Sequence, residues 1–473
     1  MLREILLSVE RLVPPVVRRL GERVYRSLPP SIRYGKHYGE AVRFLDASQW
    51  WTSDQHETWQ LARVQELVRH AYAHSPFYRT RFDAHGVHPD DLRCLSDLAR
   101  FPTVGKEDLR EHAEDIRVTN LPRSKFQYHT TGGSTGRPVG LYWEADRTVP
   151  LERAFMRRQF GWVGFELDAD RSVALRGVPV RDGRLYETLP GRQIRFSSYD
   201  MTPENLDHYL DVIDEFRPAA IMAYPSAAHI FAQHVLARGG HRFDGLRVVL
   251  CGSENFYAWQ RELIAEAFGC RAYSWYGQSE YVALGGECEH STDYHFYSEY
   301  GVTEILGPHG VAAGPGESGE IVATGFNNRA FPLIRYRTED VARRSARRSC
   351  ECGRNYLLVE TVEGRLQEMI VAKAGNLISM TAINMHSDVF DNVRQFQFYQ
   401  DTPGRVTLRI IRHERYSDMD TQRIRAALLE KLRDQFDLDI EFVASIPLTP
   451  RGKATFLEQK LPINSDSARD RQP

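Results

Sequence analysis

The sequence is poor in three features that would each assign it to a class of protein. Six cysteines in 473 residues are too few and too unevenly spaced for a disulfide-stabilised scaffold. No apolar run approaches the roughly 20 residues of a transmembrane helix, and charges interrupt the apolar stretch near the N-terminus. The 61 basic side chains do not exceed the 63 acidic ones, which argues against nucleic-acid binding. We therefore expect a cytoplasmic protein with no nucleic-acid partner.

Length and aromatic content indicate a folded protein of more than one domain. Aromatic residues make up 11% of the chain, which is too many for a disordered protein. The length exceeds the roughly 250 to 300 residues over which a single core keeps growing, so at least two domains are expected.

The N-terminal segment 2–30 reads as two short amphipathic helices broken at Pro14 and Pro15. It carries six arginines and three glutamates, so it could lie on an anionic membrane surface. We favour the alternative, in which its Leu/Val face packs on the protein's own core. A firm helix is predicted over 55–74, where apolar residues recur at helical spacing.

A loop rich in glycine and hydroxyl residues occupies 128–140 (YHTTGGSTGRPVG). Its flexible backbone amides and hydroxyls could surround a phosphate group. It is not a Walker A loop, because Arg137 and Pro138 stand where that motif has Lys and Ser/Thr. Taken alone, the loop could equally be a turn between two strands.

The middle of the chain alternates between predicted strands and helices. Strands are expected at 219–224 and 246–250 and ending at Trp275–Tyr276, with helices between them starting at Thr202–Pro203, Ser226 and around Trp259. This alternation predicts a parallel sheet, whose ligands bind beyond the carboxyl ends of the strands. Those ends are the segments 223–226, 251–254 and 276–280.

After Arg365 the pattern changes to short alternating strands around one helix, which predicts a small two-layer α+β domain. The last residues, 464–473, are predicted to be a disordered tail.

Five motifs follow one another in a fixed order. After the glycine-rich loop come YGQSE (276–280), FPLIRYRTED (331–340), VEGR (362–365) and PLTPRGK (447–453). The set resembles the adenylate-forming superfamily, and within it the phenylacetate-CoA ligase branch with the CapK-like proteins and coenzyme F390 synthetases. The resemblance runs from about Trp59 to Leu461. It implies an α/β fold with a large multi-sheet N-terminal adenylate-forming domain and a smaller α+β C-terminal lid.

The resemblance also implies domain limits. Residues 1–363 would bind ATP and the acid, with 1–50 as a helical extension, and residues 364–463 would form a mobile lid.

The resemblance implies roles for the residues that match its motifs. Tyr276 would stack on adenine, Ser279 and Glu280 would meet the ATP phosphates and Mg²⁺, Asp340 would bind the ribose hydroxyls, and Arg365 would lie near the ribose. Lys453, on the lid, would bridge the substrate carboxylate and the α-phosphate. The remaining ATP-binding residues would be Thr131, Gly132, Gly133, Ser134, Thr135, Gly136, Ser253, Glu254 and Gly277.

These residue types suit the chemistry, because attack of a carboxylate on the α-phosphorus brings two anions together and needs positioned positive charge. Without the resemblance, Tyr276 could be a core residue, Glu280 a helix-start carboxylate and Lys453 a solvated lysine.

Three positions depart from the family's pattern. Arg137 replaces a common lysine, Glu339 replaces the glycine of YRTGD and adds negative charge beside the ribose site, and Gln367 occupies the hinge position.

Cysteine and histidine gather in two separate segments, GGECEHSTDYH and RRSCECGRN. Thiolates and imidazole are zinc's preferred ligands, although reduced cysteines packed as small hydrophobic residues are an alternative. Relatives carry a similar set, so we predict a structural zinc site and prefer His295 over His290. The predicted ligands are Cys288, His295, Cys350 and Cys352.

The predicted function is an AMP-forming ligase that adenylates an aryl or acyl carboxylic acid with ATP and Mg²⁺ and passes the acyl group to CoA. Alternatives are transfer to an amine or a sugar hydroxyl, or a catalytically inactive binding or scaffold protein. By position in the fold, the acid pocket would include Ser198, Tyr199, Tyr224 and Ser226, although these residues could simply pack the sheet.

Overall fold

The computed structural model describes most of the chain. Several predicted features fall outside the described residues: most of the N-terminal segment, the loop Thr131–Gly136, Arg365, Gln367, Lys453 and the C-terminal tail. The described residues are 28, 30–130, 139–177, 185–189, 192–199, 201–307, 310–363, 369–375, 377–383, 388–446 and 456–461.

Helices and one hairpin precede the main sheet. Helix α5 confirms the helix predicted over 55–74. Its start is fixed by Thr52, whose side chain accepts from the backbone of Gln55 while the Gln55 side chain accepts in return. The helices are α3 (Pro30–Tyr34), α4 (Lys36–Ser48), α5 (Ser53–His74), α6 (Pro76–Ala84), α7 (Lys106–Ile116) and α8 (Thr148–Trp162), with 3₁₀ turns at Pro89–Asp91, Leu95–Arg100 and Arg123–Lys125.

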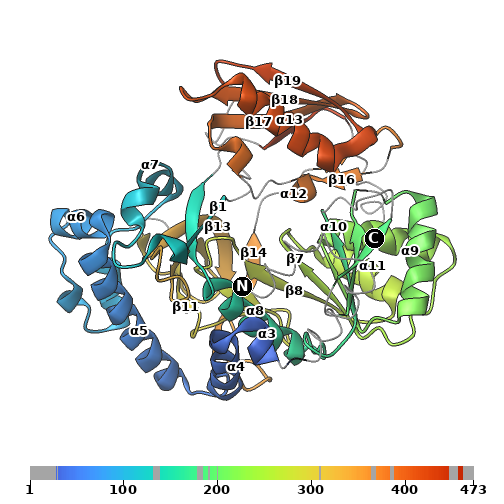
Figure 1. The fold of residues 1–473 in the computed structure, drawn as a ribbon. Coiled ribbons are helices and arrows are strands. Elements are labelled where there is room, and N and C mark those ends of the chain that lie inside the picture. Colours follow the sequence, from blue (N-terminus) through green and yellow to red (C-terminus); the bar gives the residue numbers. More distant parts are fainter. Residues whose placement is uncertain are drawn as a thin grey trace.

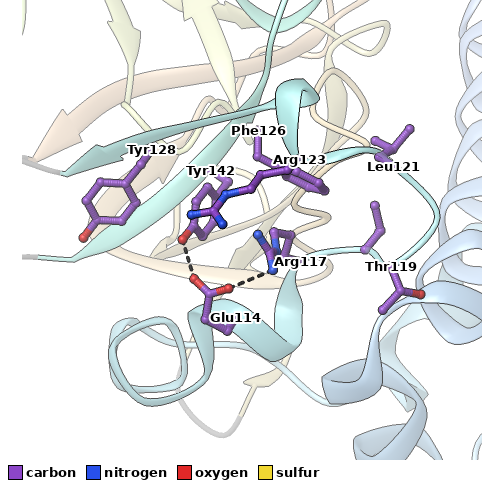
Figure 2. Close-up of a pocket in the computed structure, with 9 residues that line it drawn as sticks. Glu114, Arg117, Thr119, Leu121, Arg123, Phe126, Tyr128 and Tyr142 are labelled. Atoms are coloured by element: carbon purple, nitrogen blue, oxygen red, sulfur yellow. Dashed lines mark hydrogen bonds and ion pairs between the residues drawn. The ribbon is translucent and has the colours of Figure 1, made fainter.

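Strands β1 (Phe126–Thr130) and β2 (Gly140–Glu144) form an antiparallel hairpin that flanks the predicted phosphate loop. The hairpin and the end of α7 border an open cavity of about 670 Å³ (Figure 2).

The body is built on one large sheet, to which the described residues contribute twelve strands in the order β11-β12-β13-β14-β10-β9-β8-β7-β6-β3-β5-β4. Strands β5, β3, β6, β7 and β8 run parallel, and the others pair antiparallel. The strands are β3 (Ser172–Arg176), β4 (Tyr186–Leu189), β5 (Gln193–Ser197), β6 (Ala220–Ala223), β7 (Val248–Gly252), β8 (Ala272–Gly277), β9 (Leu284–Gly286), β10 (Tyr294–Phe296), β11 (Gly301–Leu306), β12 (Ser318–Gly325), β13 (Tyr336–Arg344) and β14 (Leu357–Glu363).

The parallel strands are joined by the predicted crossover helices α9 (Pro203–Phe216), α10 (Pro225–Ala237) and α11 (Ala258–Phe268), which lie together on one side of the body in Figure 1. Thr202 caps α9 by accepting from the backbone of Asn205, as the Thr-Pro pair predicts. Strand β7 begins at Val248, two residues later than expected, after a turn at Asp244–Gly245.

The C-terminal elements form a separate four-stranded sheet, in the order β19-β18-β17-β20, packed against helix α13 (Figure 1). This agrees with the predicted two-layer α+β domain, while the boundary after residue 363 stays a prediction. The elements are β15 (Met369–Val371), β16 (Leu377–Ser379), α12 (Met380–Ile383), β17 (Val393–Thr402), β18 (Arg405–Arg412), α13 (Asp418–Leu432), β19 (Asp437–Phe442) and β20 (Leu457–Gln459), with 3₁₀ turns at Asp388–Phe390 and Arg433–Gln435.

Hydrogen bonds and apolar packing join the C-terminal domain to the body. The side chain of Gln435 donates to the carbonyl of Tyr199 at 2.7 Å, and the Tyr128 hydroxyl donates to Asp391 at 2.9 Å. Tyr199 is fully buried within the apolar cluster of the C-terminal domain. Within the part of the chain that the structure describes, we find no helix long and apolar enough to span a bilayer.

Candidate active site

The carboxyl ends of β6, β7 and β8 lie at one edge of the sheet, because these strands are parallel neighbours. Glu254, just beyond β7, accepts hydrogen bonds from the backbone N–H and the hydroxyl of Ser226, both at 3.0 Å. Ser226 lies in the first turn of α10, where a carboxylate is favoured by the unpaired amides. The structure thus joins a residue predicted for ATP to one predicted for the acid pocket. Ser253, the residue before Glu254, has a left-handed backbone with a φ of 70°.

The other residues predicted for the acid pocket lie near this edge. Ser198 is 6% exposed, and its hydroxyl has no hydrogen-bond partner among the described residues. The Arg176 guanidinium lies over the Tyr224 ring, 5.2 Å from its centroid. The Tyr199 hydroxyl donates to the Gly177 carbonyl at 2.9 Å. An arginine at the end of β3 was not predicted, and no motif marks it.

At the end of β8, Tyr276 and Asp340 are joined directly. The Tyr276 hydroxyl donates to Asp340 Oδ2 at 2.8 Å, and its ring packs beside Phe296 with centroids 5.6 Å apart. Burial and the nearby carboxylate raise the pKa of Tyr276 well above its ordinary value, so the phenol remains a donor. The predicted adenine-stacking residue therefore also fixes the predicted ribose carboxylate. Gly277, the last residue of β8, pairs with Leu284.

Glu280 is 7% exposed and accepts a hydrogen bond from the Tyr336 hydroxyl at 2.9 Å. Burial raises the pKa of Glu280 above its ordinary value, while the Lys106 ammonium and the Tyr336 hydrogen bond act in the opposite direction. The carbonyl of the preceding residue, Ser279, accepts from the Trp143 indole at 2.9 Å. The buried Glu280 carboxylate is thus positioned by a residue of β13. The YGQSE segment is hydrogen-bonded to the β1–β2 hairpin through Ser279.

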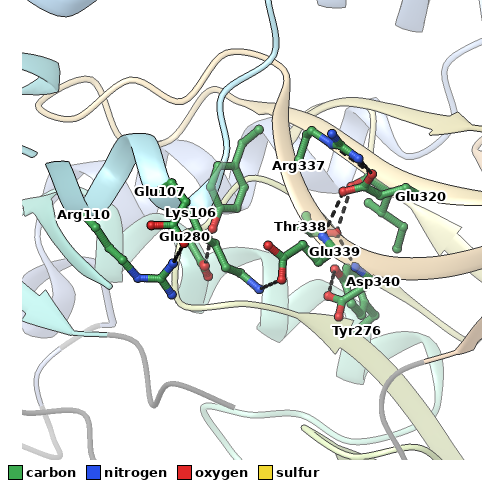
Figure 3. A network of polar contacts seen from close by, with 12 residues as sticks. Lys106, Glu107, Arg110, Tyr276, Glu280, Glu320, Arg337, Thr338, Glu339 and Asp340 are labelled. Atoms are coloured by element: carbon green, nitrogen blue, oxygen red, sulfur yellow. Dashed lines mark hydrogen bonds and ion pairs between the residues drawn. The ribbon is translucent and has the colours of Figure 1, made fainter. Parts of the chain in front are cut away.

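Lys106, the first residue of α7, reaches this group of carboxylates (Figure 3). Its Nζ lies 2.9 Å from Glu339 Oε2, and its side chain is only 16% exposed. Glu339 adopts a left-handed φ of 65°, a conformation that a glycine at this position would adopt without strain. Lys106 was not predicted as a site residue, because the stretch 81–120 shows helix starts and no motif.

The four predicted zinc ligands converge. One ligand atom from each of Cys288, His295, Cys350 and Cys352 lies within 4.8 Å of all the others. The Cys288 and Cys350 sulfurs are 3.6 Å apart, and the Cys352 sulfur is 3.3 Å from His295 Nε2. Bond lengths to zinc of about 2.3 Å for sulfur and 2.0 to 2.1 Å for nitrogen give tetrahedral edges of about 3.5 to 3.8 Å. The donor set and spacing therefore fit zinc.

The surroundings of His295 also fit a metal ligand. Its Nδ1 lies 3.1 Å from the Asp293 carbonyl, which can only accept, so Nδ1 carries the proton and Nε2 is free to bind a metal. His295 lies on β10, Cys288 just after β9, and the Cys350–Cys352 pair between β13 and β14. Strands β9, β10 and β14 are those that separate β8 from β13 in the sheet.

Known proteins identify the family. The chain is 30% identical over 347 residues to the phenylacetate-coenzyme A ligase of Aromatoleum evansii, covering 69% of this chain and 74% of that protein. The chain belongs to the phenylacetate-coenzyme A ligase family. It is therefore an AMP-forming acid ligase of the adenylate-forming superfamily, as its motif order predicts.

Other similarities cover the C-terminal domain and the fold. A model of the CapK C-terminal domain matches residues 370–460. The CapK protein of Staphylococcus aureus is 22% identical over 440 residues, covering 90% of this chain and 92% of that protein. The structure of 2-hydroxyisobutyryl-CoA ligase in complex with 2-HIB-AMP and CoA has the same fold, with a TM-score of 0.58 at 21% identity, covering 87% of this chain and 92% of that one.

Proposed function

We propose that this family member condenses a carboxylic acid with ATP and then transfers the acyl group to CoA. In the first step a carboxylate oxygen attacks the α-phosphorus, the bond to pyrophosphate breaks, and an acyl adenylate forms. In the second step the CoA thiol loses its proton and attacks the acyl carbon, and AMP leaves. The observation that carries this proposal is the pair of hydroxyl–carboxylate hydrogen bonds, Tyr276–Asp340 and Tyr336–Glu280, which lie at the carboxyl end of β8 and the start of β13.

The described residues suit distinct parts of the nucleotide. Asp340 would accept the ribose hydroxyls, with its position set by Tyr276. Glu280 would hold Mg²⁺, which supplies positive charge to the ATP phosphates when it is bound. Lys106 adds a positive charge to the same group of carboxylates. By resemblance, Thr131–Gly136, Ser253, Glu254, Gly277 and Arg365 complete the ATP site, and Lys453 joins it from the lid.

CoA has one alternative as the acceptor of the acyl group. The CapK model matches residues 370–460, which are most of the C-terminal domain, so transfer to an amine or a sugar hydroxyl is the second candidate. CoA is preferred because phenylacetate-coenzyme A ligases are the relatives with the higher identity.

The test is ATP–pyrophosphate exchange with a panel of aryl and aliphatic acids, followed by addition of CoA. Exchange with at least one acid and formation of AMP and a thioester support the proposal. Exchange without formation of a thioester favours an amine or a sugar hydroxyl as the acceptor. Absence of exchange with every acid favours an inactive binding protein. Replacing the predicted catalytic lysine, Lys453→Ala, should lower exchange by about two orders of magnitude. Wild-type exchange in that variant would refute its role.

We also propose that Cys288, His295, Cys350 and Cys352 hold a structural zinc ion. Zinc bound here would have four protein ligands and no open position, which is the arrangement of structural rather than catalytic sites. Its function would be to connect the loop after β9 to the loop before β14.

A further inference from the structure

An arginine at the carboxyl end of β3 has no opposite charge beside it. Arg176 is the last residue of β3 and is half-buried. Its guanidinium lies 5.2 Å from the centroid of the Tyr224 ring, and the described residues give it no hydrogen-bond or ion-pair partner. A charge held partly out of water is costly unless an opposite charge accompanies it. The position therefore suits an anionic group that comes from a ligand.

Arg176 belongs to a row of residues on one face of the sheet. The parallel register of β3, β6 and β7, continued by one residue past the last pairs, places Arg176, Tyr224 and Gly252 side by side. Gly252 pairs with Trp275 of β8, whose indole a Cβ at Gly252 would strike. Adjacent strands are about 4.8 Å apart, so the row extends about 14 Å from β8 to β3. Its first member, Trp275, directly precedes the YGQSE segment.

The end of the row at Arg176 offers further hydrogen-bond donors. The backbone N–H of Ser198 donates to the Arg176 carbonyl at 2.9 Å, while the Ser198 hydroxyl is buried and has no partner among the described residues. Helix α10 begins directly after Tyr224, and the start of a helix favours an anion. The Glu254 carboxylate at the same edge of the sheet accepts from the Ser226 hydroxyl at 3.0 Å. Its negative charge is therefore already hydrogen-bonded by another residue.

We propose that the acid adenylated by this protein carries a second anionic group, and that Arg176 binds that group. This inference rests on the proposed function, since it names the class of acid. The reacting carboxylate lies toward β8, and the carbon skeleton lies along Trp275 and Tyr224. Arg176 and the Ser198 hydroxyl donate hydrogen bonds to the second anionic group, which in the simplest case is another carboxylate.

The test measures kcat/KM in ATP–pyrophosphate exchange for pairs of acids that share a carbon skeleton. The pairs run from succinate and butyrate to suberate and octanoate, with 4-carboxyphenylacetate and phenylacetate as the aryl pair. A charge-assisted hydrogen bond corresponds to a factor of about ten or more, so wild type should prefer the dicarboxylate by about that factor. Arg176→Met should abolish this preference, and Arg176→Lys, which keeps the charge, should retain part of it.

The matched control is Arg171→Met, which should keep the wild-type preference. Arg171 directly precedes β3 at the opposite end of the strand, and its guanidinium also lies against an aromatic ring, 5.5 Å from the centroid of Phe216. Thermal melting reports whether each variant is folded. If Arg176→Met does not fold, the wild-type preference and Arg176→Lys decide.

Two outcomes overturn the inference. One is exchange in wild type that is as fast with the monocarboxylate as with the dicarboxylate of every pair. The other is an equal loss with both members of a pair in Arg176→Met. If no acid supports exchange, the proposed function fails, and calorimetry with the same dicarboxylates and MgATP decides about Arg176. Binding to wild type that weakens in Arg176→Met supports the anion site, whereas no binding, or equal binding to both proteins, refutes it.

Discussion

The hydroxyl of Tyr336 should control the pH range in which the enzyme uses MgATP. Tyr336 is fully buried, and its hydroxyl donates to Glu280 at 2.9 Å. A hydrogen bond to a charged group stabilises a protein by about 1.5 to 3 kcal/mol, and 1.36 kcal/mol corresponds to a factor of ten in a protonation equilibrium. Tyr336→Phe removes the donor and leaves the ring in place.

The sign of the effect follows from the protonation states. Only the ionised carboxylate of Glu280 binds a cation, and the tyrosine favours that form. Removing the hydroxyl raises the pKa of Glu280 further, in the same direction as burial. At a pH on the acidic limb, kcat/KM for MgATP should therefore fall about tenfold or more, while the rate at alkaline pH is largely kept.

The assay is ATP–pyrophosphate exchange measured across pH. Lys106→Met should move the acidic limb in the same direction, because the lysine also lowers the pKa of Glu280. The matched control is Tyr209→Phe, which removes another buried hydroxyl, one that donates to the Ser197 carbonyl at 3.1 Å. If the profile of Tyr336→Phe keeps its shape and only its height changes, Glu280 is not the group whose ionisation limits the reaction.

Three further predictions concern the metal, the strained glutamate and the ribose carboxylate. Protein purified without chelator should contain one zinc per chain, and Cys352→Ser should lose it and melt at a lower temperature, while Cys94→Ser, at an exposed cysteine, should keep it; metal-free wild type would refute the site. Glu339→Gly should be about 1 kcal/mol more stable to denaturant than Glu339→Ala, because only glycine relieves the left-handed backbone; the reverse order would contradict the strain. Tyr276→Phe should raise the KM for ATP about tenfold by freeing the carboxylate it holds, and an unchanged KM would show that this carboxylate does not bind the ribose.

Much of the fold follows from local patterns. The helix over 55–74 and the crossover helices have strong apolar periodicity and recognisable caps, so their existence is readable from neighbouring residues. The four predicted zinc ligands also have a local signal in the sequence, because they fall in two short segments rich in cysteine and histidine. The order of the large sheet was not predicted, since pairings such as β10 with β14 join residues about 60 positions apart.

The contacts within the site were harder to foresee. Lys106 reaches Glu339 across 233 positions because Val104, two residues before it, forms a β-bridge with Tyr336 at the start of β13, and no motif records that pairing. Tyr336 lies within FPLIRYRTED, but its partnership with Glu280 depends on strands that are not sequence neighbours. The motif order predicts which residues form the site, whereas the hydrogen bonds and ion pairs that shift their pKa values come from tertiary structure.

The cysteine and histidine cluster has a consequence for the chain as a polymer. A metal held there would join Cys288 to Cys350, which are 62 positions apart, and so close the chain into a ring. For a permanent cross-link, a ring of this size corresponds to about 4 kcal/mol of unfolded-state entropy. Asp340 lies inside the ring and Tyr276 just before it. The carboxylate proposed to bind the ribose would then lie within a closed ring of the chain, which restricts its movement relative to Tyr276 in the unfolded state as well as in the folded one.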